Sequence, residues 1–97
     1  MSYQDLSARY PEYIPAIVFA DKDIEPFIKK KKYLIPMDIN FGTAIISIRK
    51  NIVGMKSSDA LIYIVENRII SPNVMMRELA KPKDFLYIKI IKESTFG

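Results

Sequence analysis

Hydrophobic residues along the chain fall into short groups separated by proline and polar residues, and the spacing inside each group predicts its structure. Near the start, Leu6 and Tyr10 lie four residues apart, as on one face of a helix. Ser2 and Asp5 have the spacing of a capping box, and Pro11 ends the pattern. We therefore expect the chain to begin with a short helix.

Four apolar groups rich in β-branched residues predict strands, at residues 14–20, 33–36, 60–65 and 85–91. Pro15 has no N–H to donate, so its strand is expected at a sheet edge or with an irregular beginning. The nearly unbroken apolar run over residues 60–65 is typical of a central strand covered on both faces. The polar residues 21–32 indicate a loop or a helical turn.

Two further helices are predicted. For the first of them, Asn40 offers an N-cap. Arg49 and Lys50 lie in its last turn, where positive side chains suit the negative end of the helix dipole. The apolar residues between them follow helical spacing: Phe41, Ala44, Ile45, Ile48 and Ile52. A shorter helix is expected to start with Pro72 in its first turn and to end before Pro82.

The element order predicts an α+β fold, in which a four-stranded mixed sheet wraps one helix and an additional helix precedes it. A chain of 97 residues is expected to form a single domain. Within it we expect an N-terminal helix over residues 1–11, a core over 12–92 and a flexible tail over 93–97. The 49% hydrophobic and 27% charged content is that of a globular protein.

The chain has no cysteine and no histidine. These absences remove thiolate zinc sites and the nucleophilic pairs that need Cys or His, so neither an enzyme nor a metal or cofactor site is predicted. A net charge of +4 favours acidic partners, and a small basic nucleic-acid-binding module remains a remote alternative that salt-dependent binding would test. With no apolar run of 18 residues and no secretory signal, we expect a cytoplasmic protein.

Several blocks together resemble the autophagy ubiquitin-like modifiers, the family that includes the GABA-receptor-associated and light-chain-three proteins. They are I-P-A-I at residues 14–17, K-Y-L-I-P-M-D-I at 32–39, I-R-K-N-I at 48–52, F-L-Y at 85–87 and S-T-F-G at 94–97. The likeness runs from Leu6 to Gly97 and implies a ubiquitin-like β-grasp. Family members usually carry two N-terminal helices, and this chain has room for only the second.

The resemblance implies a conjugated modifier. Gly97, preceded by Phe96, would be joined through its carboxylate to the amino group of phosphatidylethanolamine. The implied partners are activating-like and conjugating-like enzymes, and a cysteine protease that processes and deconjugates the protein. The lipidated form would reside on autophagosomal or other cytoplasmic vesicle membranes. A modifier attached to a protein, or an adaptor that is never conjugated, remains the alternative.

The resemblance also implies a peptide-binding surface, because an edge strand can accept an extended peptide. Strand 33–36 would bind receptor proteins through an aromatic-x-x-aliphatic motif. The aromatic pocket would be lined by Leu6, Ile14, Pro15, Ile17, Lys32, Leu34 and Phe85. The aliphatic pocket would be lined by Tyr33, Ile35, Pro36, Ile39, Ala44 and Ser47. Ala44 and Ser47 are smaller than is usual in the family, so a deeper or looser second pocket is expected.

The lysine run over residues 29–32 has three interpretations. It is a solvated charged face, a phosphate contact, or a rim that attracts acidic residues beside the docking motif. Lys30 and Lys32 are assigned to the peptide-binding surface, and Lys32 is the expected direct contact.

Overall fold

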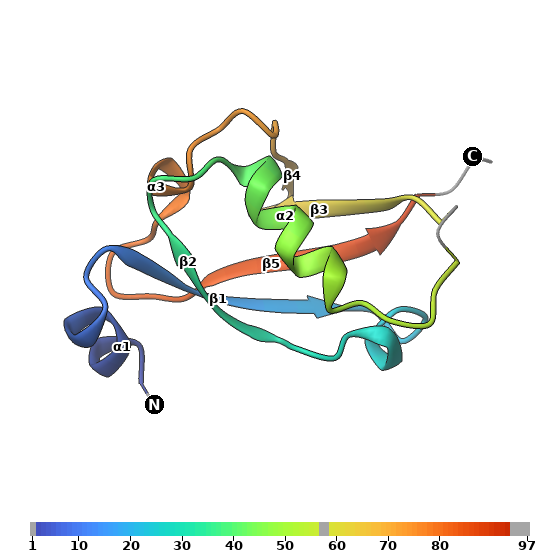
Figure 1. The fold of residues 1–97 in the computed structure, drawn as a ribbon, viewed down its shortest axis with the longest axis horizontal. Coiled ribbons are helices and arrows are strands. Elements are labelled where there is room, and N and C mark those ends of the chain that lie inside the picture. Colours follow the sequence, from blue (N-terminus) through green and yellow to red (C-terminus); the bar gives the residue numbers. More distant parts are fainter. Residues whose placement is uncertain (1, 57–58, 94–97) are drawn as a thin grey trace.

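The computed structural model describes residues 2–56 and 59–93, which form one mixed sheet with a helix across one face (Figure 1). The elements are α1 (Tyr3–Arg9), β1 (Tyr13–Ala20), η1 (Glu25–Phe27), β2 (Lys32–Pro36), α2 (Phe41–Lys50), β3 (Leu61–Val65), β4 (Arg68–Ile69), α3 (Met76–Leu79) and β5 (Leu86–Lys92). The strand order is β2-β1-β5-β3-β4, with β1 and β5 parallel and the other neighbours antiparallel. The α+β class and the mixed sheet are confirmed.

The prediction of four strands was incomplete, because the described residues form a sheet of five. The additional strand, β4, follows a tight turn at Glu66 and Asn67, whose φ angles are 51° and 63°. A two-residue hairpin turn requires positive φ at both central positions, which usually favours glycine. Here no glycine marks the turn, and of its two central residues only Asn67 is of a type enriched at positive φ, so the sequence signal for the reversal was weak.

The hydrophobic core lies between the sheet and α2 (Figure 1). Side chains alternate along β1 and β5, and the buried members face α2: Ile14, Ala16, Val18, Leu86, Ile88 and Ile90. From the helix, Phe41, Ala44 and Ile48 complete the core. The predicted N-cap is confirmed, since the Asn40 side chain accepts a hydrogen bond of 2.9 Å from the Thr43 N–H.

The predicted first helix is also confirmed as α1, and both bonds of the Ser2–Asp5 capping box are present. α1 lies at the end of the sheet where β1 begins (Figure 1), and its Leu6 lines a cavity together with Leu34 and Phe85. It has no buried residue. It is fixed to the rest of the fold in part by the Tyr3 hydroxyl, which donates a 3.3 Å hydrogen bond to the Lys81 carbonyl.

Two prolines behave differently from the prediction. β1 is an interior strand, so the edge position expected from Pro15 was wrong. Pairing of β1 with β5 begins only at Ala16, so Pro15 has a strand partner on one side alone. Pro72 lies in a turn rather than in a helix, and its carbonyl accepts a 3.0 Å hydrogen bond from the Gly42 N–H. α3 starts four residues later, at Met76.

The core predicts a contrast between two isoleucines of α2. Ile48 is 1% exposed, whereas Ile46, on the outer face, is 59% exposed. We expect Ile48→Ala to lower the free energy of unfolding by about 2–5 kcal/mol, the usual effect of removing a buried Ile side chain. Ile46→Ala should change it by less than about 0.5 kcal/mol, as at most surface sites. Urea unfolding followed by circular dichroism measures both, and equal losses would contradict this assignment of the core.

Candidate functional site

Strand β2 forms one edge of the sheet, as the sequence predicted. It pairs with β1 from Ile17↔Lys32 to Tyr13↔Pro36. Its other side has no strand partner within the described part of the chain. An edge of this kind presents backbone N–H and C=O groups to which an extended peptide can add as a new strand.

The two faces of β2 differ in exposure. Ile35 is 5% exposed and packs into the core beneath α2. Leu34, its neighbour, points to the opposite face and is 36% exposed. An added peptide would therefore meet an accessible apolar side chain on the α1 side of the sheet.

A cavity of about 500 Å³ lies beside this face of β2. Its lining combines apolar walls with two lysines: Leu6, Ala16, Lys30, Lys32, Tyr33, Leu34 and Phe85. The helix α1 supplies Leu6, and the Tyr3 ring packs edge-on against Phe85 with centroids 5.8 Å apart. α1 therefore contributes one wall of the cavity and contacts a second lining residue, Phe85.

The predicted aromatic pocket overlaps this cavity in four residues: Leu6, Lys32, Leu34 and Phe85. Ile14 and Pro15 are buried and Ile17 is half-buried, and none of the three lines the cavity. The cavity instead includes Ala16 and Tyr33, a cross-strand pair between β1 and β2. Ala16 and Tyr33 meet because of the register between β1 and β2, and the sequence alone does not predict that register.

Most residues of the predicted aliphatic pocket lie on the α2 side of β2, whereas Pro36 shares the opposite face with Leu34. Ile35 and Ala44 belong to the core, and Ser47 is exposed. The remaining members are half-buried: Tyr33, Pro36 and Ile39. A ligand on the α2 side would therefore contact Tyr33 and Ile39 above a floor of core residues.

The lysine run divides between two roles. Lys31 forms an ion pair with Glu25, and its hydrogen bond and charge hold the pKa of that carboxyl below its usual value. Lys29 donates a 3.3 Å hydrogen bond from Nζ to the Pro26 carbonyl. Both lysines thus connect β2 to the η1 turn.

Lys30 and Lys32 are directed to the cavity instead. Lys30 Nζ lies 4.8 Å from the centroid of the Tyr33 ring, a cation–π distance. Burial raises the pKa of the Tyr33 hydroxyl. The cavity therefore has a positively charged rim, formed by Lys30 and Lys32, beside its apolar walls.

Other chemistry is limited in residues 2–56 and 59–93. No group of three or more acidic side chains there could hold a metal ion. No helix in these ranges combines the length and apolar character needed to cross a bilayer. Phe96 and Gly97 lie outside the described residues. The chain reaches them through Glu93, whose N–H donates a 2.9 Å hydrogen bond to the Ala60 carbonyl.

Comparison with known proteins relates this fold to one family. The model of the family described as "Autophagy protein Atg8 ubiquitin like" matches residues 2–97. Autophagy-related protein 8e of Arabidopsis thaliana is 39% identical over 95 residues, which cover 92% of this chain and 76% of the relative. Autophagy-related protein 8 of Dictyostelium discoideum is 38% identical over 98 residues, 95% of this chain and 80% of the relative.

Solved structures agree on the fold. Trypanosoma brucei ATG8 superposes with a TM-score of 0.79 at 24% identity, covering 98% of this chain and 85% of that one. Plasmodium falciparum Atg8 in complex with a P. falciparum Atg3 peptide superposes with a TM-score of 0.78 at 22% identity, and the match covers 95% of this chain and 85% of that one. Together with the family match, these superpositions confirm the ubiquitin-like β-grasp. The chain therefore belongs to the Atg8 family of ubiquitin-like autophagy proteins and is not an enzyme.

Proposed function

We propose that this protein is a lipid-conjugated autophagy modifier that recruits motif-bearing proteins. Its C-terminal Gly97 is joined to phosphatidylethanolamine, and the β2 edge binds cargo receptors and autophagy proteins that carry aromatic-x-x-aliphatic motifs. The protein is cytoplasmic when free and resides on autophagosomal or other vesicle membranes when lipidated. The observation that carries this proposal is the unpaired β2 edge beside a cavity walled by Leu34 and Phe85.

The chemistry of the tail supports conjugation. Gly97 has no side chain to obstruct attack at its carboxylate, so it can be activated, transferred to a thiol and then to the amine of the lipid. The chain has no cysteine, so the thiols belong to the activating and conjugating enzymes and to the processing and deconjugating protease. The P. falciparum relative was solved with an Atg3 peptide, which supports a conjugating enzyme as partner.

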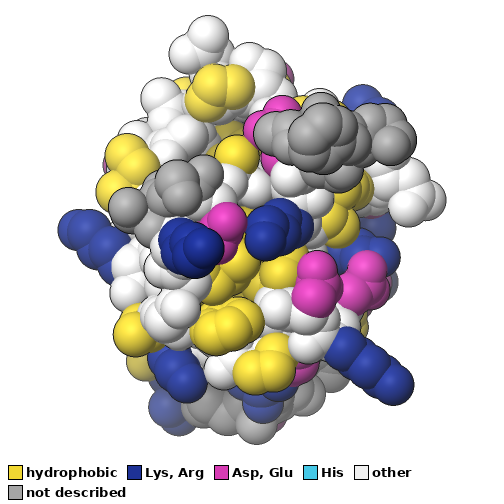
Figure 2. Space-filling view, turned by 90° about the vertical axis from the view of Figure 1, so that its right-hand side faces the viewer, with side chains coloured by type: hydrophobic (Ala, Val, Ile, Leu, Met, Phe, Trp, Pro, Cys, Tyr) yellow, Lys and Arg dark blue, Asp and Glu magenta, His cyan; other side chains and the backbone are white. Residues whose placement is uncertain are grey.

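The surface at the end of the molecule where β5 ends also suits a membrane. Figure 2 looks at the end of the molecule towards which β5 runs, where lysine and arginine side chains stand among exposed apolar ones and a smaller number of acidic ones. The loop after α2 lies at this end (Figure 1), and Val53 within it is 53% exposed. Basic and apolar side chains together favour contact with anionic lipid surfaces. The conjugated lipid supplies the remaining membrane affinity.

The docking site lies away from the end of β5, the last described strand before the tail. The molecule extends 43 Å along its longest axis, and α1, which forms one wall of the cavity, lies at the opposite end from the point where β5 ends (Figure 1). A peptide can therefore add to β2 while the tail is attached to a membrane. The aromatic side chain of the peptide enters the cavity, and acidic residues before it approach Lys30 and Lys32. Each exposed ion pair contributes about 0.2–1 kcal/mol, so the lysines mainly adjust selectivity.

The role of the tail predicts that deleting Gly97 abolishes conjugation. With purified activating and conjugating enzymes and liposomes containing phosphatidylethanolamine, the intact chain should float with the liposomes and gain the mass of the lipid. The Gly97 deletion should remain free, while Leu34→Ala, which alters only the cavity wall, should still be conjugated. Lipidation of the deleted chain would contradict the mechanism, and a protein adduct found by mass spectrometry would favour the alternative of attachment to a protein.

The cavity predicts which substitutions weaken peptide binding. Phe85→Ala and Leu34→Ala should each weaken binding of an aromatic-x-x-aliphatic peptide by about 1–3 kcal/mol, as for other interface anchors. Tyr87→Ala is the matched control, because Tyr87 is an aromatic residue close to Phe85 that is 46% exposed and lies outside the cavity. Isothermal titration calorimetry measures the peptide affinity of all three variants. Unchanged affinity in folded Phe85 and Leu34 variants would refute the assignment of the pocket.

A further inference from the structure

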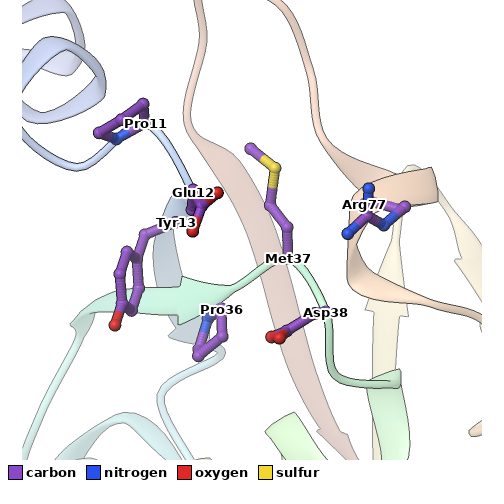
Figure 3. A pocket seen from close by; sticks show the side chains of 7 residues that line it. All are labelled: Pro11, Glu12, Tyr13, Pro36, Met37, Asp38 and Arg77. Carbon is purple, nitrogen blue, oxygen red and sulfur yellow. The ribbon is translucent and has the colours of Figure 1, made fainter.

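A second pocket, of about 400 Å³, lies where β2 ends and β1 begins. Figure 3 shows its charged side chains, with Glu12 and Arg77 on opposite sides of Met37 and Asp38 below them. Tyr13 and Pro36 form part of its wall. Neither the conjugation of the tail nor the aromatic cavity uses this pocket.

The backbone beneath this pocket is held from two sides. The Met37 N–H donates a 3.1 Å hydrogen bond to the Glu12 carbonyl, and the Met37 carbonyl accepts one of 3.2 Å from the Arg77 N–H. Three segments distant in sequence are thereby joined at one residue. The charged side chains consequently project from a fixed frame rather than from separate loops.

The pocket continues the face of the sheet that carries the aromatic cavity. Alternate residues of a strand share a face, so Lys32, Leu34 and Pro36 lie in one row, about 7 Å apart. Lys32 and Leu34 line the aromatic cavity, and Pro36 lines the second pocket. Tyr13, which pairs with Pro36 across the strands, extends the row onto β1. One extended peptide on β2 would therefore pass both sites.

The charges of the two sites are opposite. Lys30 and Lys32 stand at the beginning of β2, whereas the second pocket holds two carboxylates and one guanidinium, an excess of one negative charge. Among the ion pairs of the described residues, none involves Glu12, Asp38 or Arg77. The carboxylates are thus available to a cation, and the edge has a positive end and a negative end.

We propose that this pocket binds an arginine or lysine side chain at the position directly after the aliphatic residue of the docked motif. An aromatic residue and the fourth residue after it share a face of an extended peptide, about 13 Å apart. This matches the separation of Lys32 from Pro36, and the aliphatic residue between them points to the α2 side. The charge order places acidic residues before the aromatic one and the basic residue after the aliphatic one. The inference rests on the proposed peptide binding at β2.

Three peptides that differ only at this position test the proposal against the full chain by titration calorimetry. They carry an aromatic-x-x-aliphatic motif followed by Arg, Ala or Glu. The Arg peptide should bind about two- to fivefold more tightly than the Ala peptide, as expected for an exposed ion pair, and the Glu peptide more weakly than either. The paired variant Glu12→Gln, Asp38→Asn should remove the preference for Arg and leave the affinity for the Ala peptide unchanged.

Asp23→Asn is a control for net charge, because Asp23 is exposed in the loop after β1 and should leave the preference for Arg intact. Equal affinities for the three peptides would overturn the proposal and leave peptide binding at β2 standing. The same conclusion would follow if the paired variant kept the preference. If no peptide of the set binds, the proposed docking function itself fails, and this inference fails with it.

Discussion

The parallel pairing of β1 with β5 is the constraint on which the rest of the structure depends. It joins residues from the two ends of the chain, from Ala16↔Leu86 to Ala20↔Ile90, and places both strands inside the sheet. Parallel neighbours need a crossover, which here contains α2 and the core it covers. Because β5 occupies one side of β1, β2 can take only the other side and ends the sheet. The open edge that we propose as the docking site is thus a consequence of the central pairing.

The charge along the β2 edge is uneven, which the overall composition does not indicate. A net charge of +4 suggests a uniformly basic surface. In the structure, Lys29 and Lys31 instead contact the η1 turn, whereas Lys30 and Lys32 line the cavity. At the other end of β2 the excess charge is negative. The edge is therefore electrically polar, and a polar edge can distinguish the direction in which a peptide lies.

Most of the fold could be predicted from the sequence because its signals are local. The Asn40 cap, the Ser2–Asp5 capping box and the apolar spacing of α2 all act within a few residues. The predictions that were wrong concern positions where contacts between distant segments determine the local structure. Pro72 resembles the start of a helix, but its carbonyl bonds to the Gly42 N–H in a turn. For the site, Leu34 and Phe85 follow from family likeness, whereas Ala16 enters only through its pairing with Tyr33.

The helix α1 forms a wall of the aromatic cavity and has no buried residue of its own. Its contribution to the core is correspondingly small, so substitutions on its inner face can alter the shape of the cavity at little cost in stability. Folding therefore constrains the side chains of β1, β5 and α2 more strongly than those of α1. Related chains can in this way acquire new peptide preferences by changing one short helix while the sheet remains the same.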